Sequence, residues 1–268
     1  QDLTGSPTVW SPLNLGSWDV SSDRKQHSLS AWLARHSAAG GLGRLRLHLA
    51  APWYHLQGLY IRRAGEPRCD RGVAPLLSLL SSVAGLHGLE LRGLGLKRLP
   101  PQLTGLGSLR ELSLRGNSAL GRKGHTAFQP LLALTALTKL DLRATGLQVL
   151  PVQLSACAAT LSDLDVSVNP VLAQGGPATL QPLAQLSALT RLDLSECALV
   201  ELPAALPNLR LLAELSLCFE AELPPRLAEA AVVPLRQLTA LTRLDLACTG
   251  ADPSAVRALV GPRVQLSC

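Results

Sequence analysis

Aromatic residues, methionine and long apolar runs are scarce or missing in this 268-residue sequence. Aromatic side chains make up 3% of the chain and methionine does not occur, although 47% of the residues are hydrophobic. The core must therefore be built from leucine, alanine and valine. No stretch approaches the roughly 18 consecutive apolar residues that a membrane-spanning helix needs, so we expect no membrane insertion.

Cysteine use argues against a secreted protein that is stabilised by disulfides. The six cysteines form no CxxC pair and no closely spaced framework, and the Asn-x-Ser/Thr acceptor for glycosylation is missing. Small secreted domains rely on disulfide frameworks, because their compartments are oxidising. We therefore expect an intracellular protein, located in the cytoplasm.

Motifs for catalysis, metal binding and nucleotide binding are also missing. The six histidines stand outside any HExxH or His/Cys spacing that would suit zinc. The glycine run at residues 40–43 follows a helical pattern, whereas a phosphate loop follows a strand. The net charge of +6 forms no basic stripe with interleaved aromatics. We expect no enzymatic activity, no cofactor, no metal and no nucleic-acid partner.

What the sequence does contain is one stretch that recurs. LTKLDLRATGLQVL begins at Leu137, returns at Leu189 as LTRLDLSECALVEL, and returns again at Leu241 as LTRLDLACTG. Its leucines alternate with charged residues, so they point to one side of a short strand. One such strand cannot bury its leucines alone. Copies stacked side by side would form a parallel sheet, and we expect about nine strands.

The pattern LxxLxLxxNxL resembles the leucine-rich-repeat superfamily, and its copies cover roughly residues 86 to 250. The resemblance implies an α/β solenoid with a curved parallel sheet on the concave side and alternating helices and tight turns on the convex side. It also implies that the position after each strand points inward and satisfies backbone groups at the turn. That position is filled by Leu94, Asn117, Thr145, Asn169, Cys197, Glu220 and Thr249.

Short and long repeats alternate along the chain. The second leucine of the strand motif falls at Leu89, Leu112, Leu140, Leu164, Leu192, Leu215 and Leu244, so the steps are 23–24 or 28–29 residues. The short connectors carry LPxxL and resemble the plant and bacterial type of repeat, whose turns are tight. The long connectors resemble the ribonuclease-inhibitor type, and we expect a proper helix in each, beginning near Pro130, Pro182 and Pro234.

We divide the chain into three parts. Residues 1–72 are an N-terminal cap with degenerate repeats, in which we expect a helix over SLSAWLARH, a strand at residues 45–49 and a repeat strand at residues 56–61. Residues 73–250 hold the leucine-rich repeats. Residues 251–268 form a C-terminal cap or last partial repeat, with a helix near Pro253 and a strand around Leu266.

The outward-facing positions of the strands are the candidate site. Like charges on adjacent strands are destabilising, yet arginine stands in one column for three consecutive strands and then gives way to serine. This run favours an acidic partner. The predicted partner-binding residues are Arg92, Arg115, Lys139, Asp141, Arg143, Asp165, Arg191, Asp193 and Phe219. The competing interpretation is that Asp beside Arg or Lys only pairs across strands and keeps the face soluble.

These observations predict a non-catalytic module that binds another protein, one with an acidic patch, on its concave face. A rigid repeat surface loses little entropy on binding, which suits this role. The alternative is the substrate-recognition part of a multi-subunit ubiquitin ligase. That alternative resembles the F-box proteins and requires a helical adaptor upstream of Gln1.

Overall fold

The computed structural model of the chain describes residues 13–14, 31, 45–50, 54–56, 59–61, 77–78, 86–218, 233–250 and 252–267. Within these residues ten strands form one parallel sheet, in the order β1-β2-β5-β6-β7-β8-β9-β10-β11-β12. The strands are β1 (Leu13–Asn14), β2 (Leu45–Ala50), β5 (Leu86–Arg92), β6 (Glu111–Ser113), β7 (Lys139–Asp141), β8 (Asp163–Asp165), β9 (Arg191–Asp193), β10 (Glu214–Ser216), β11 (Arg243–Asp245) and β12 (Gln265–Ser267). The predicted parallel solenoid is confirmed, with one strand more than the nine expected.

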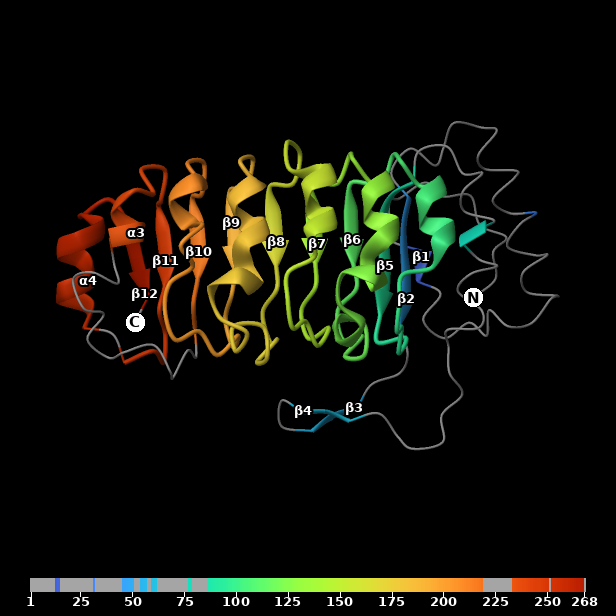
Figure 1. Ribbon diagram of the computed structural model, residues 1–268, viewed down its shortest axis with the longest axis horizontal. Helices are drawn as coiled ribbons and strands as arrows, with labels where there is room; N and C mark the ends of the chain where they lie inside the picture. The colour runs from blue at the N-terminus through green and yellow to red at the C-terminus, as the bar shows by residue number, and fades with distance from the viewer. Residues whose placement is uncertain are drawn as a thin grey trace.

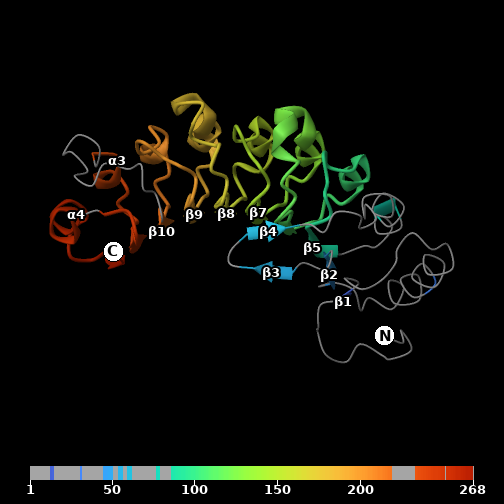
Figure 2. The same ribbon diagram turned by 90° about the horizontal axis from the view of Figure 1, so that it is seen from below.

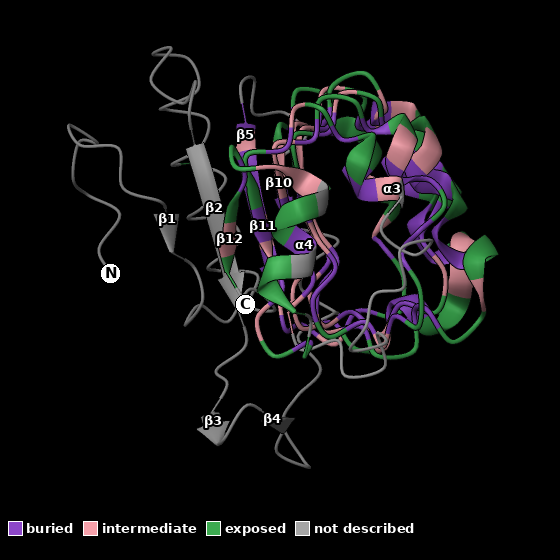
Figure 3. Cartoon of the chain, turned by 90° about the vertical axis from the view of Figure 1, so that its left-hand side faces the viewer, coloured by how far each residue is buried: buried purple, intermediate pink, exposed green. Residues whose placement is uncertain are grey.

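The sheet and the convex connectors enclose a leucine core. Consecutive strands pair so that their central leucines align, as Leu112 does with Leu140 and Leu140 with Leu164. These three leucines are at most 1% exposed, and burying each side chain stabilises the fold by about 1.5–3 kcal/mol before entropy costs. Figure 1 shows the strands side by side along the long axis. Figure 2 shows the sheet on the inner side of the curve, and Figure 3 shows the buried residues gathered between sheet and connectors.

The convex connectors alternate in length as predicted. The short ones carry η1 (Pro101–Gly105), η3 (Val152–Cys157) and η5 (Leu206–Asn208), and the long ones carry η2 (Gly121–Ala133), η4 (Pro177–Gln185) and α3 (Val233–Arg236).

The expectation of proper helices in the long connectors is wrong for η2 and η4, which are 3₁₀ helices. Pro130 and Pro182 lie inside these helices instead of near their starts, whereas Pro234 is the second residue of α3. Strand spacing supplies a physical reason. An α-helix is about 10 Å wide while adjacent parallel strands are about 4.8 Å apart, so the tighter 3₁₀ coil can follow the sheet with less curvature.

A ladder of buried side chains closes the turns after β6, β7, β8, β9 and β11. The Asn117 amide donates to the carbonyl oxygens of Leu91 (2.7 Å) and Leu114 (2.6 Å) and accepts from the Leu96 N–H (3.1 Å). Asn117 is fully buried. The inward position predicted for this column is therefore confirmed here.

The same column continues in the following repeats. The Asn169 oxygen accepts from the N–H groups of Thr145 (3.1 Å) and Leu147 (3.0 Å), the Thr145 hydroxyl donates to its own turn, and the Cys197 thiol donates to Val166 O (3.3 Å). These side chains take up backbone groups that the departing chain leaves without sheet partners. Glu220, in the same column, lies outside the described residues.

The N-terminal part departs from the sequence prediction. Residues 56–61 do not form one repeat strand, because β3 (Tyr54–Leu56) and β4 (Leu59–Ile61) pair antiparallel as a separate two-stranded sheet. Only two residues separate these strands, the length of a tight hairpin loop. β2 matches the predicted strand. Most of SLSAWLARH lies outside the described residues. The one residue of this segment that the structure describes, Ala31, is helical.

At the other end, the elements agree with prediction. Helix α4 (Pro253–Val260) begins where Asp252 accepts a hydrogen bond from the Ser254 N–H (2.9 Å), and β12 then pairs with β11.

Candidate partner-binding face

The concave face of the sheet consists of three columns of outward-facing side chains, and the strand register aligns them. We name them by their order along each strand. The first column contains Gly88, Glu111, Lys139, Asp163, Arg191, Glu214 and Arg243, and the middle column contains Glu90, Ser113, Asp141, Asp165, Asp193, Ser216 and Asp245. The third column contains Arg92, Arg115, Arg143, Ser167, Ser195, Cys218 and Ala247, each two residues beyond the middle column.

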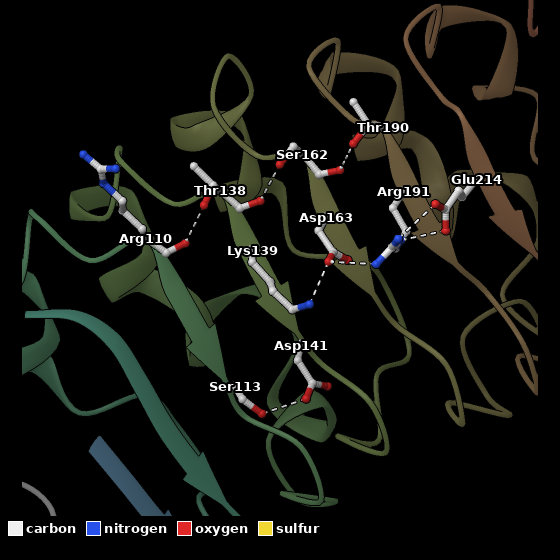
Figure 4. Close-up of polar contacts among 10 residues, drawn as sticks. All are labelled: Arg110, Ser113, Thr138, Lys139, Asp141, Ser162, Asp163, Thr190, Arg191 and Glu214. Carbon is white, nitrogen blue, oxygen red and sulfur yellow. Dashed lines mark hydrogen bonds and ion pairs between the residues drawn. The ribbon is translucent and has the colours of Figure 1, made fainter. Parts of the chain in front are cut away.

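The first column alternates in charge and pairs with itself. Lys139 Nζ lies 2.8 Å from Asp163 Oδ2, and Arg191 lies 3.8 Å from the same carboxylate. Arg191 also donates two 2.9 Å hydrogen bonds to Glu214, from Nε and from the terminal nitrogen (Figure 4). Hydrogen bonding between these two raises the pKa of Arg191 and lowers the pKa of Glu214. Lys139 and Arg191, predicted as partner-binding, are thus held in pairs within the chain.

In the middle column, four aspartates share a structural role that sequence reasoning missed. One carboxylate oxygen of each accepts the N–H two residues later, as in Asp141 with Arg143 (3.0 Å) and Asp193 with Ser195 (2.9 Å). Asp165 and Asp245 do the same. The signal was available, because Asp stands two residues before the backbone leaves the sheet in each of these repeats.

These aspartates differ from Asp163 and Glu214 of the first column, which form ion pairs with Lys139 and Arg191. Among the described residues, none forms an ion pair with Asp141, Asp165, Asp193 or Asp245. Burial raises the pKa of Asp165, and the adjacent charges of Asp193 and Asp141 raise it further, against hydrogen bonds from Ser167 that lower it. Three aspartates on adjacent strands therefore form a negative tract without a counterion in the described chain.

The third column brings the predicted arginines together on adjacent strands, and all three are half-buried. Arg92 Nε lies 3.2 Å from Glu90 Oε2 and donates to Ser113 Oγ (3.2 Å). Arg143 donates to Ser167 Oγ (3.4 Å), while its Nε is buried and has no hydrogen-bond acceptor. The column then changes to buried Ser167 and Ser195.

Phe219, the remaining predicted binding residue, lies outside the described residues.

A hydroxyl ladder borders the first column, and it was also missed. Thr138 donates to Arg110 O (3.1 Å), Ser162 to Thr138 O (3.1 Å), and Thr190 to Ser162 O (2.9 Å), as Figure 4 shows. Thr242 donates to Ala213 O (3.1 Å) in the same way. The sequence signal was the Thr or Ser that precedes the first-column residue in these repeats. This ladder fixes the strand starts and thereby the spacing of the charged columns.

Two hollows lie on the concave face where the middle column carries a serine. The first, of about 60 Å³, surrounds Ser113 and is lined by Glu90, Arg92, Lys139 and Asp141 among others. The second, of about 210 Å³, surrounds Ser216. It is lined by Arg191, Asp193, Glu214, Arg243, Asp245 and the strand leucines. A small side chain between two acidic neighbours produces each hollow.

Solved structures of leucine-rich-repeat proteins resemble this arrangement. An internalin from Listeria monocytogenes has a TM-score of 0.58 at 16% identity, covering 97% of this chain and 72% of its own. LegL7 from Legionella pneumophila has a TM-score of 0.56 at 18% identity, covering 96% and 82%. A Leptospira interrogans leucine-rich-repeat protein has 0.56 at 20%, covering 86% and 49%. The fold of this chain is that of the leucine-rich-repeat proteins.

A curated human protein, vasorin, is 31% identical to this chain over 116 residues, which are 43% of this chain and 16% of vasorin. The chain thus spans a small part of vasorin and about half of the Leptospira protein. No protein-family model matches the sequence. Within the described residues, every helix falls short of the length and apolar character needed to cross a bilayer.

Proposed function

We propose that this chain is a non-catalytic module that binds another protein on its concave face, with an acidic patch of the partner over Arg92, Arg115 and Arg143. Leucine-rich-repeat folds present a large rigid surface, and rigid surfaces lose little entropy when they bind. Lys139 borders this site, but its pair with Asp163 reduces its part in binding.

The observation that carries the proposal is Arg143. It is a half-buried cation on the concave face. Within the part of the chain that the structure describes, its Nε has no acceptor and the side chain to which it hydrogen-bonds is the neutral Ser167. Arg115 lies beside it in the same column. Repeat folding does not require arginine here, because Ser195 occupies the same place 52 residues later. A carboxylate from a partner would pair with the guanidinium charge of Arg143, and this attraction would make association sensitive to salt.

The test compares two triple variants that change the net charge equally. Arg92→Glu/Arg115→Glu/Arg143→Glu alters the concave arginines, and Arg122→Glu/Lys123→Glu/Arg236→Glu alters exposed cations of the convex connectors. Each immobilised protein is used to capture partners from cell extract at several salt concentrations, after circular dichroism has shown that it is folded.

We expect the concave variant to lose partner capture by more than tenfold and the convex variant to retain it. Equal retention by both variants would refute the arginine site. The alternative role in a ubiquitin ligase stays a prediction that depends on an adaptor upstream of Gln1, and the cytoplasmic location also stays a prediction.

A further inference from the structure

The two concave hollows occupy equivalent places but differ in how their charges are satisfied. Around the first hollow, Ser113 accepts from Arg92 Nε (3.2 Å) and donates to Asp141 Oδ2 (2.7 Å), while Arg92 also pairs with Glu90. The polar groups of the first hollow are thus connected to one another. Its volume, about 60 Å³, is correspondingly small.

Around the second hollow the hydrogen bonds of the serine run to the third column, where the Cys218 thiol also hydrogen-bonds with Asp245. Ser216 hydrogen-bonds with the hydroxyl of Ser195 (2.8 Å) and contacts the Cys218 thiol (3.4 Å), both in the third column. Asp193 and Asp245 each use one oxygen for a backbone N–H and form no ion pair with a described residue. The second hollow therefore has two half-buried carboxylates facing about 210 Å³ of space.

The cations at the rim of the second hollow do not neutralise these carboxylates. Arg191 is held by two hydrogen bonds to Glu214. Arg243 is exposed, forms no ion pair in the described chain and acts on Glu214 only at longer range. Asp193 and Asp245 lie two strand spacings apart, about 9.6 Å. A single positive group placed between them would lie within roughly 5 Å of both, where unlike charges attract.

We propose that the second hollow receives a basic side chain, Lys or Arg, of the same partner whose acidic patch covers the arginines. This inference rests on the proposed function, and it adds that the partner carries a basic side chain as well as an acidic patch. The hollow has several times the roughly 30 Å³ that one water molecule takes up in the liquid, so a long side chain can enter it. The two contacts together would fix the partner's direction along the sheet, because the basic third column lies at β5–β7 and the hollow between two aspartates of the middle column lies at β9–β11.

The distance between the arginine site and the second hollow sets the length of the peptide that tests the proposal. From β6 to β10 there are four strand steps, about 19 Å, and six extended residues span about 20 Å. The probe is a synthetic peptide with three glutamates, a six-residue Gly/Ser linker and one arginine. A second peptide carries citrulline, the neutral analogue of arginine, in its place. Binding of both is measured by fluorescence anisotropy at low ionic strength.

We expect the arginine peptide to bind roughly fivefold more tightly than the citrulline peptide. Asp193→Asn/Asp245→Asn should abolish this preference, since asparagine keeps the oxygen that accepts the backbone N–H but removes the charge. The matched control, Glu196→Gln/Glu201→Gln at exposed positions outside the lining of the second hollow, should keep the preference. Ser216→Lys, which places a cation in the hollow from within the chain, should also abolish it.

The outcomes separate this inference from the proposed function. If the two peptides bind the native chain equally, the basic side chain in the second hollow is refuted. The proposed function still stands in that case if Arg92→Glu/Arg115→Glu/Arg143→Glu weakens both peptides. If that triple variant leaves both affinities unchanged, or if neither peptide binds the native chain, both proposals are wrong.

Discussion

Two repeat pairs, β6 to η3 and β8 to η5, follow the same backbone course 52 residues apart, and their differences separate residues that serve the fold from residues that are free to serve function. Asn117 and Asn169 are both fully buried and make equivalent bonds. At the third column, by contrast, Arg143 in the first pair is replaced by Ser195 in the second. Buried positions repeat because backbone polar groups must be satisfied, whereas outward positions change because the backbone does not constrain them.

The largest difference between the buried positions of the two repeat pairs lies where two loops approach each other closely. Gly121 lies where a Cβ would come within 2.5 Å of the backbone of Gly146 and Leu147. Ala173 occupies the corresponding place in the second pair. The first pair thus depends on glycine at a contact where the second carries a methyl group.

We expect Gly121→Ala to destabilise the fold by up to about 3 kcal/mol, because backbone atoms cannot move aside as side chains can. Urea unfolding followed by circular dichroism measures the change. The control is Gly107→Ala, where the nearest atom to an added Cβ is 3.9 Å away. A loss below 0.5 kcal/mol at Gly121, on the order of an ordinary surface change, would contradict the close contact.

The next largest effect tests the amide ladder that the two pairs share. Asn169→Leu keeps the branched shape but leaves the N–H groups of Thr145 and Leu147 and the carbonyl of Val166 without this partner. We expect a loss of roughly 1 to 3 kcal/mol in the free energy of unfolding. Asn208→Leu, at an exposed position of η5, should change stability little. Similar losses for both would show that the ladder does not stabilise the turn.

A smaller effect concerns the residue before each buried amide. Gly116 and Val168 both have positive φ, 77° and 59°, a region that costs an L-residue roughly 1–2 kcal/mol. Valine is β-branched, so its presence there is unusual. A Cβ added at Gly116 would lie no closer than 3.7 Å to its neighbours, so the first atom of a new side chain meets no close contact there.

The exchange of these residues should therefore have opposite effects. Gly116→Val should destabilise by about 1 kcal/mol, and Val168→Gly should stabilise by less than that, because glycine also increases the entropy of the unfolded chain. Thermal unfolding of the two single variants checks the signs. Destabilisation by both would mean that the Val168 side chain makes a stabilising contact at the edge of the concave face.

The sequence was sufficient for the repeat strands from β5 onward, the leucine core and the buried amides, because the repeat period places Leu140, Asn117 and Asn169 without reference to distant residues. It was insufficient for residues 56–61, where the repeat pattern is degenerate and β3 and β4 pair antiparallel. It was insufficient for η2 and η4, since the narrow strand spacing that favours a 3₁₀ coil is a property of the stacked sheet. It also could not separate Lys139, which pairs with Asp163, from Arg143, which forms no ion pair in the described chain. That distinction depends on side-chain geometry across strands.

The smallest expected effect concerns Asp165, which has acidic neighbours on both sides, whereas Asp245 lies between Ser216 and Ser267. The pKa of Asp165 is raised, first by burial and then by Asp193 and Asp141. The folded state therefore holds the proton more tightly than the unfolded state, and the ionised carboxylate costs stability above the folded pKa. That cost disappears as the pH falls through the folded pKa and below the ordinary value of 3.8.

Asp165→Asn should consequently stabilise the fold at neutral pH by a few tenths of a kcal/mol, within the usual ±0.5 kcal/mol of an outward substitution. Asparagine can still accept a hydrogen bond from the Ser167 N–H, so the backbone conformation at the end of β8 is preserved. The gain should shrink toward zero between neutral pH and about pH 3, as measured by thermal unfolding across that range. A gain that stays the same from neutral pH to about pH 3 would contradict the raised pKa of Asp165 and the contribution that Asp193 and Asp141 make to it.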